Sequence, residues 1–304
     1  MGSSSMSQTN WGSYIDNTVR SKATVDQIYT SRNMKDSLNP KGINRESRDS
    51  DANPNSCPII VGLDVTGSMS DILNYMARDG LETLVKEIIK RKPVPDPHMM
   101  YMGIGDGYCD SAPLQVTQFE TDEKLVDQLR EIWLEECGGG NNSEGYSLAW
   151  YFANFHTQTD QFEKRKKKGF LFTIGDDGPT PAVELDHIKR IFGDPAEEGI
   201  DSKTLLKMVS EKYHVFHINL SNRRSSWNNG TKIQDRWKEL LGERAIDLKD
   251  HTKAAELIIS LIQTTSGVDK DQVINSWDNS TSMIIKDSLN GLSNVKEEND
   301  VVVF

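Results

Sequence analysis

Three short polar loops of this sequence combine residue types that could bind a divalent cation. The first is Asp64-Val-Thr-Gly-Ser68, the second is Gly138 to Ser143, and the third is Gly175-Asp-Asp-Gly-Pro179. Their side chains supply carboxylate, hydroxyl and amide oxygens, with no histidine or cysteine among them. Hard oxygen ligands select Mg²⁺, Mn²⁺ or Ca²⁺ over zinc. The chemistry predicted from these loops is therefore the binding of Mg²⁺, with Mn²⁺ or Ca²⁺ as alternatives.

Two of the loops directly follow apolar runs that predict buried strands. Residues 58–63 precede the first loop and residues 169–174 precede the third, while the second loop leads into a predicted helix over about 144–156. Continuous apolar runs are typical of parallel strands that are covered on both faces. Because sites in such sheets form outside the carboxyl ends of the strands, the loops are expected to meet in space.

The predicted fold class is α/β, with a doubly wound, mostly parallel sheet and helices on both faces, as in Rossmann-like folds. Amphipathic helical patterns separate the strand-like runs, and this alternation is the signature of such a sheet. Further strands are predicted at 99–104, 114–119 (an edge strand), 214–220 and 245–248.

The chain divides into three parts by composition. Residues 1–56 are polar and predict an irregular N-terminal arm, in which residues 1–5 resemble a tag remnant ahead of Met6. Residues 57–265 carry the alternating strands and helices, and residues 266–304 form an acidic tail with two weak helical patterns.

Charge and composition exclude several classes of function. The formal net charge of −11 argues against a nucleic-acid-binding protein, which normally carries a basic face. The basic run Lys164 to Lys168 is interpreted as a solvated helix end. No apolar run approaches the roughly 20 residues of a membrane span, so no membrane partner is expected. Three cysteines without paired spacing favour a reducing, cytoplasmic location.

The loops resemble those of von Willebrand factor A (VWA) domains. Asp64-Val-Thr-Gly-Ser68 resembles the D-x-S/T-x-S signature of that family, in the same context after a strand and before a long helix. Gly139-Gly-Asn-Asn-Ser-Glu144 is similar to the GGGD-x-PE variant of some intracellular branches. Thr173-Ile-Gly-Asp-Asp-Gly-Pro179 resembles the loop that supplies a third ligand. The resemblance covers roughly residues 57–265.

The resemblance implies a metal-ion-dependent adhesion site built from all three loops. Direct ligands would be the hydroxyls of Thr66 and Ser68 and the amide of Asn141, and Asp64 and Asp176 would act directly or through water. Asn141 stands where the family usually has threonine. The second-loop ligand stays open between Asn141, Asn142 and Ser143, and Asp177 is the alternative to Asp176.

In the family, a partner's Asp or Glu fills the one open coordination position. A cation with few direct carboxylate ligands attracts such a group strongly. Intracellular VWA proteins resemble adaptors that act with AAA+ ATPases or other complexes. The predicted function is therefore a cytoplasmic, Mg²⁺-dependent protein-binding module without enzymatic activity.

Three alternative interpretations remain open. Asp64 could cap the following helix and do nothing else, since Asp, Thr and Ser are all common caps. The first and third loops also resemble the D-x-T-G-T and GD-x-x-x-D loops of haloacid dehalogenase-like phosphotransferases, in which Asp64 would be the nucleophile. The chain could also be a structural subunit whose site is unused.

Overall fold

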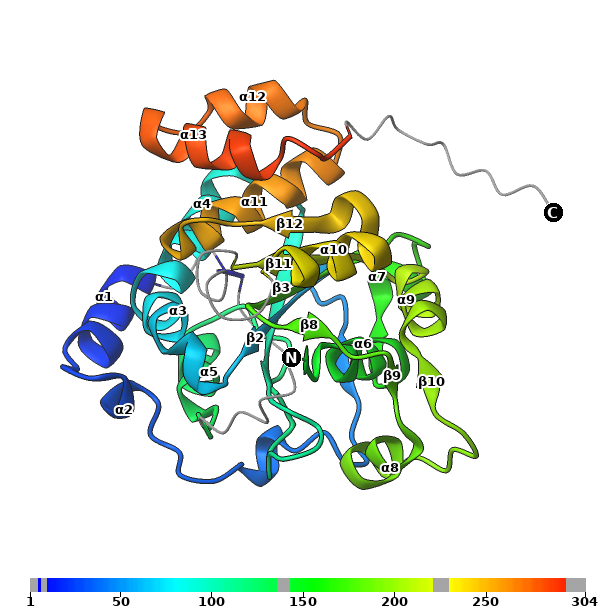
Figure 1. Cartoon of the computed structure of the whole chain (residues 1–304). Helices are drawn as coiled ribbons and strands as arrows, with labels where there is room; N and C mark the ends of the chain where they lie inside the picture. The colour runs from blue at the N-terminus through cyan, green and yellow to red at the C-terminus, as the bar shows by residue number, and fades with distance from the viewer. Residues whose placement is uncertain (1–4, 7–9, 136–142, 221–229, 294–304) are drawn as a thin grey trace.

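The computed structural model of this chain describes residues 5–6, 10–135, 143–220 and 230–293 (Figure 1). The ligand candidates Asn141 and Asn142 therefore lie outside the described residues.

A six-stranded sheet forms the centre of the molecule. The strands are ordered β12-β11-β7-β2-β3-β4, and all neighbouring pairs are parallel except β3 and β4, which are antiparallel. Their bounds are β2 (Ser56–Asp64), β3 (Asp96–Ile104), β4 (Leu114–Val116), β7 (Gly169–Gly175), β11 (Tyr213–Asn219) and β12 (Ala245–Asp247). The predicted α/β class with a mostly parallel sheet is confirmed, and the expected edge strand at 114–119 is the short β4.

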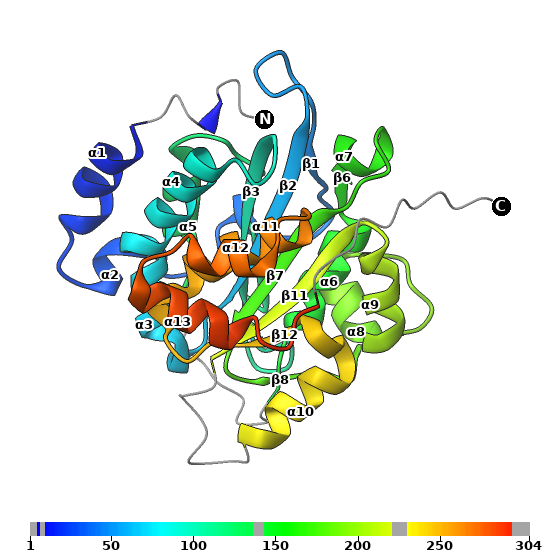
Figure 2. The same cartoon turned by 90° about the horizontal axis from the view of Figure 1, so that it is seen from above.

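Helices cover both faces of the sheet, which explains why the central strands are apolar without alternation. Side chains of β2 alternate between two cores: Ile59 and Val61 pack with one helix layer, and Ile60 packs with the other. Figure 2 shows these layers from above. The first layer comprises α3 (Ser70–Tyr75), α4 (Leu81–Arg91), α5 (Lys124–Glu131) and α11 (Ala254–Thr265). The second comprises α6 (Tyr146–Phe155), α9 (Ser202–Ser210), α10 (Gly230–Leu241) and the helical turn Ile188–Phe192 that continues α8 (Leu185–His187).

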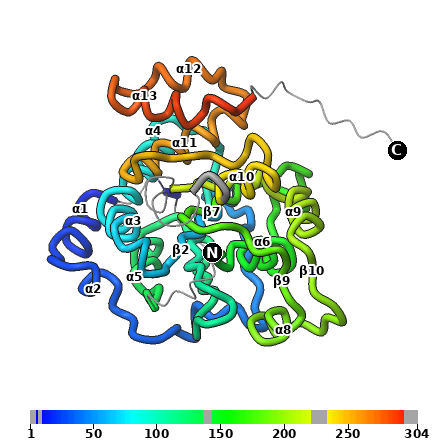
Figure 3. The backbone as a smooth tube through the Cα atoms, in the orientation of Figure 1, coloured from blue at the N-terminus to red at the C-terminus, as the bar shows by residue number. Residues whose placement is uncertain are grey.

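The N-terminal arm packs along the first helix layer. Trp11, Ile15 and Val19 recur every four residues and are fully buried in the core that α4 also lines. Further along the arm, β1 pairs in parallel with β6. The arm thus adds a small second sheet to the domain, and its helices α1 and α2 lie at one side of the molecule (Figure 3). Its elements are α1 (Trp11–Ile15), α2 (Val25–Ile28) and β1 (Arg45–Ser47), and β6 spans Thr157–Thr159.

The two helical patterns of the tail form α12 (Lys270–Asn275) and α13 (Asn279–Ser288), which pack over α11 (Figure 1). Trp277 lies between them, and its indole N–H donates to Ser260 Oγ of α11 at 2.9 Å. The Arg91 guanidinium covers the same ring at 3.6 Å from its centroid. These contacts attach the tail helices to the helix layer beneath them.

Among the described residues, no helix combines the length and the apolar character needed to cross a membrane. The remaining short elements are β5 (Ser143–Glu144), α7 (Asp160–Glu163), β8 (Gly178–Pro179), β9 (Ala182–Val183) and β10 (Ile200–Asp201).

Candidate metal centre

The topology brings the three polar loops to one edge of the sheet. Strands β2 and β7 are parallel neighbours, so the loops that begin at Asp64 and Gly175 leave the sheet side by side. The second and third loops are joined by the short parallel pair of β5 and β8, in which Ser143 lies opposite Gly178. The predicted meeting of the loops at the carboxyl ends of the strands is therefore observed for their described residues.

The first loop holds its carboxylate by hydrogen bonds from its own hydroxyl and backbone. Thr66 donates to Asp64 Oδ1 from its backbone N at 2.9 Å and from Oγ1 at 2.6 Å. Asp64 is 0% exposed, because it ends a strand that is buried along its whole length. A hydroxyl that gives its proton to a carboxylate keeps its lone pairs available for a cation. Thr66 is thus suitably arranged to act as a ligand.

A second hydroxyl–carboxylate pair connects the first loop to the third. Ser68 Oγ donates to Asp176 Oδ1 at 3.0 Å, although the two residues are 108 positions apart. The structure therefore brings together Asp64, Thr66, Ser68 and Asp176 among the predicted ligands. The alternative, Asp177, is also buried, and its backbone carbonyl accepts a hydrogen bond from the Trp237 indole at 2.8 Å.

The described part of the second loop argues against Ser143 as the ligand. Its hydroxyl accepts a hydrogen bond at 3.2 Å from Arg236 of α10, which also donates to the carbonyl of Pro179. The Ser143 hydroxyl is thus already bound to the positively charged side chain of Arg236. Asn141 and Asn142 lie outside the described residues, so their part in the site stays a prediction.

Glu144 is a site residue that the predicted ligand set did not include. Its side chain is 3% exposed, and its Oε2 has no hydrogen-bond partner among the described residues. Burial above all, together with the charges of Asp64 and Asp177, raises the pKa of Glu144 to about 10. The signal for it in the sequence was its place at the end of the second-loop motif, directly before α6.

Burial also raises the pKa of Asp64, to about 7, and the nearby charge of Asp176 adds to this shift, while hydrogen bonds from Thr66 and Tyr146 oppose it. Neither Asp64 nor Glu144 forms an ion pair with any Lys, Arg or His of the described residues. Buried carboxylates that lack a countercharge are costly, and a divalent cation would offset that cost.

The donor set fits Mg²⁺ by its chemistry. Within the described ranges, no three carboxylate, imidazole or thiol groups gather closely enough to hold a metal by themselves. The ligands present are instead hydroxyls backed by carboxylates, which are hard oxygen donors. Thr66, Ser68 and Asp176 would hold the ion, Asp64 would act beside them, and the ion would supply an electrophilic position for an external carboxylate.

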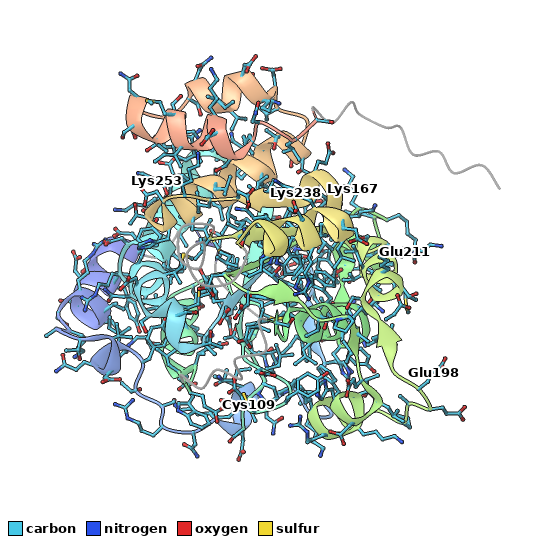
Figure 4. All side chains as sticks on the ribbon, in the orientation of Figure 1. Cys109, Lys167, Glu198, Glu211, Lys238 and Lys253 are labelled. Carbon is cyan, nitrogen blue, oxygen red and sulfur yellow. The ribbon has the colours of Figure 1, made fainter. Side chains whose placement is uncertain are left out.

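The exposed thiol of Cys109 does not contribute a nucleophile to this edge. Cys109 lies in the loop after β3 (Figure 4), and its Sγ contacts Asp110 Oδ1 at 3.6 Å. Desolvation and the charges of Asp110 and Asp106 raise the pKa of the thiol well above its usual range. The thiol is therefore held in its protonated, poorly nucleophilic form.

Comparisons with known proteins identify no family for this chain. No protein-family model and no curated protein matches it. Among solved structures, it is similar to the pilus adhesin SpaC from Lactobacillus rhamnosus GG in its open conformation, with a TM-score of 0.46 and 12% identity over 77% of this chain and 31% of that one. A second form of the same adhesin gives a TM-score of 0.47 and 10% identity over 77% and 32%. The chain thus spans about a third of the length of these structures.

Proposed function

We propose that this chain is a Mg²⁺-dependent protein-binding module of the VWA type. The observation that carries the proposal is the pairing of two hydroxyls with two carboxylates: Thr66 with Asp64 within the first loop, and Ser68 with Asp176 between the first and third loops. A hydroxyl that donates its proton to a carboxylate can offer its oxygen to a cation, and the carboxylate fixes its orientation. The partner would supply an Asp or Glu to the open coordination position.

Helix capping alone does not account for the arrangement of Asp64 and Thr66. Asp250 and Thr252 form the same local turn as Asp64 and Thr66, with Thr252 donating to Asp250 Oδ1 from N at 2.9 Å and from Oγ1 at 2.7 Å. That turn is exposed, and it caps a helical turn in the usual way. Asp64 differs in being fully buried beside a second carboxylate, Asp176.

The phosphotransferase alternative requires Asp64 to attack a substrate. Both of its carboxylate oxygens already accept hydrogen bonds, from Thr66 and Tyr146, and the side chain is buried. This arrangement disfavours Asp64 as a nucleophile and supports a non-enzymatic role. A cytoplasmic adaptor that acts with an AAA+ ATPase or another complex remains our working proposal for the biological context.

The test is calorimetric titration of Mg²⁺ and Mn²⁺ into the wild type and into Asp64→Ala combined with Thr66→Ala. We expect one site in the wild type and none in the double variant. The matched control is Asp250→Ala with Thr252→Ala, which removes the same local turn at a remote place and should keep the site. A wild type that binds neither metal would refute the proposal.

Partner binding is then compared in Mg²⁺ and in EDTA for the same three proteins. Retention of a partner by the wild type and the control in Mg²⁺, with loss in EDTA and in the Asp64/Thr66 variant, is the expected result. If the partner is bound equally well with and without EDTA, and equally well by the Asp64/Thr66 variant, the structural-subunit interpretation is supported instead.

A further inference from the structure

The hydroxyl of Tyr146 joins the first and third loops from behind the candidate metal centre. Tyr146 begins α6, directly after the second loop, and its side chain is fully buried. Its hydroxyl donates to Asp64 Oδ2 at 2.8 Å and accepts a hydrogen bond from the backbone N of Asp177 at 3.4 Å. One phenol therefore contacts the loops that follow two different strands.

The backbone of the third loop is shaped to admit this hydroxyl. A Cβ atom at Gly175 would lie 1.8 Å from the Tyr146 oxygen, so only glycine leaves room for the phenol at the point where β7 ends. Just beyond, Asp177 is held through its N–H by Tyr146 and through its carbonyl by the Trp237 indole. The position of the third loop thus depends on the position of the Tyr146 ring.

The ring itself is clamped by aromatic neighbours. His217 packs edge-on to Tyr146 at 4.9 Å between centroids, and Trp237 does so at 5.3 Å. These two residues also stack on each other, at 3.6 Å and 10°. Edge-to-face aromatic contacts of this kind fix ring orientation. Burial and the charge of Asp64 raise the pKa of Tyr146 well above its usual value, so the phenol keeps the proton that it donates.

We propose that the Tyr146 hydroxyl is a positioning group of the metal centre and sets its preference for Mg²⁺ over Ca²⁺. The inference rests on the proposed Mg²⁺ site. With Thr66 bonded to Oδ1 and Tyr146 bonded to Oδ2, the Asp64 carboxylate is held at both oxygens and cannot rotate freely.

A rigid carboxylate discriminates between the two ions. Mg²⁺ requires a nearly ideal octahedron with short bonds, whereas Ca²⁺ tolerates irregular geometry and longer bonds. Loss of the Tyr146 hydroxyl would let the Asp64 carboxylate turn, and would release the N–H of Asp177. Outer groups that orient metal ligands commonly contribute about 10–100-fold to metal affinity. Without the Tyr146 hydroxyl, the affinity for Mg²⁺ should therefore fall more than the affinity for Ca²⁺.

The test compares Tyr146→Phe with Tyr213→Phe by calorimetric titration of Mg²⁺ and Ca²⁺ separately. Tyr213 is a matched control, because its hydroxyl is equally buried and makes one side-chain hydrogen bond, to Thr157 Oγ1 at 2.6 Å, at the other end of the sheet. We expect Tyr146→Phe to weaken Mg²⁺ binding about tenfold or more, and Ca²⁺ binding by no more than about threefold. Tyr213→Phe should leave both affinities unchanged.

The outcomes separate this inference from the proposed function. If the wild type binds Mg²⁺ and Tyr146→Phe binds it equally well, the positioning role is overturned. If the variant loses affinity for both ions in the same proportion, the role in ion preference is overturned. In both cases the metal site stands. If the wild type binds no metal, both fail. A wild type that binds Ca²⁺ more tightly than Mg²⁺ also overturns the inference, and that measurement does not depend on how well any variant folds.

Discussion

The carboxylates at the two ends of the sheet differ in whether a positively charged side chain lies beside them. At the amino end of β2 and β7, Asp49 accepts hydrogen bonds from Arg165 at 2.8 and 3.0 Å, and Asp160 is paired with Arg48 and Lys164. Hydrogen bonds from Arg165 above all hold the pKa of Asp49 well below its usual range. At the carboxyl end, Asp64 has no ion-pair partner among the described residues, and burial raises its pKa to about 7.

The difference lies in whether a countercharge is present: Asp49 and Asp160 have one, and Asp64 has none among the described residues. The amino-end cluster has its countercharges built in, and it ties the arm to the helix before β7 through Arg48 and Asp160. At the carboxyl end, Asp64 and Glu144 lack such countercharges among the described residues, at a cost to stability that a bound cation would remove. Such local costs are typical of functional sites. Four predictions test this comparison, from the largest expected effect to the smallest.

Removing an amino-end carboxylate should destabilise the protein. Asp49→Ala leaves the Arg165 guanidinium partly buried without its main partner and breaks two hydrogen bonds from Ser56, so we expect a loss of roughly 2–4 kcal/mol. Chemical denaturation would measure it. Asp51→Ala is the control, because Asp51 is exposed and its removal should change stability by less than about 0.5 kcal/mol. Equal effects of the two variants would contradict the structural role of Asp49.

Neutralising Asp64, at the carboxyl end of the sheet, should instead stabilise the protein. Asp64→Asn keeps the shape of the side chain and removes a buried charge, but its amide nitrogen replaces one oxygen that accepts a hydrogen bond. The metal-free protein at pH 8 should therefore gain only about 1–2 kcal/mol of stability. Mg²⁺ binding should be lost in the same variant. Asp250→Asn, at the exposed turn, should neither stabilise the protein nor change metal binding. A destabilised Asp64→Asn protein would show that the carboxylate serves the fold.

The advantage of Asp64→Asn should shrink as the pH falls. The pKa of Asp64 is about 7 when folded and lower when unfolded, so the folded wild type takes up a proton as the pH drops through 7 and gains stability relative to the unfolded chain. Between pH 8 and pH 6 the difference in unfolding free energy between the variant and the wild type should narrow by about 1 kcal/mol. A constant difference across this range would mean that Asp64 does not titrate there.

The smallest effect should come from Ser143. Because its hydroxyl is engaged by Arg236, Ser143→Ala should change Mg²⁺ affinity by less than about threefold, whereas loss of a direct ligand in Asn141→Ala should cost at least about tenfold. The same calorimetric titration serves for both variants. A large loss in Ser143→Ala with none in Asn141→Ala would reassign the second-loop ligand to Ser143.

The strands and the first-loop turn could be predicted from the sequence because both depend on near neighbours. The apolar runs of β2 and β7 follow from burial on both faces, and the bond from Thr66 to Asp64 spans only two residues. The burial of the N-terminal arm was harder to predict from the sequence. Trp11, Ile15 and Val19 do recur at a helical spacing, but they lie in a polar segment whose composition obscures them.

The sequence by itself determined the fold class, the three loops and the oxygen chemistry that they carry. Only the tertiary structure decided that Asp176 meets Ser68, that Ser143 faces Arg236, and that Glu144 is buried at the site. It also decided that Tyr146 reaches Asp64, although 82 positions separate them. The physical reason is that strand and turn propensities act over a few residues, whereas burial and countercharge depend on which distant segments the sheet order makes neighbours.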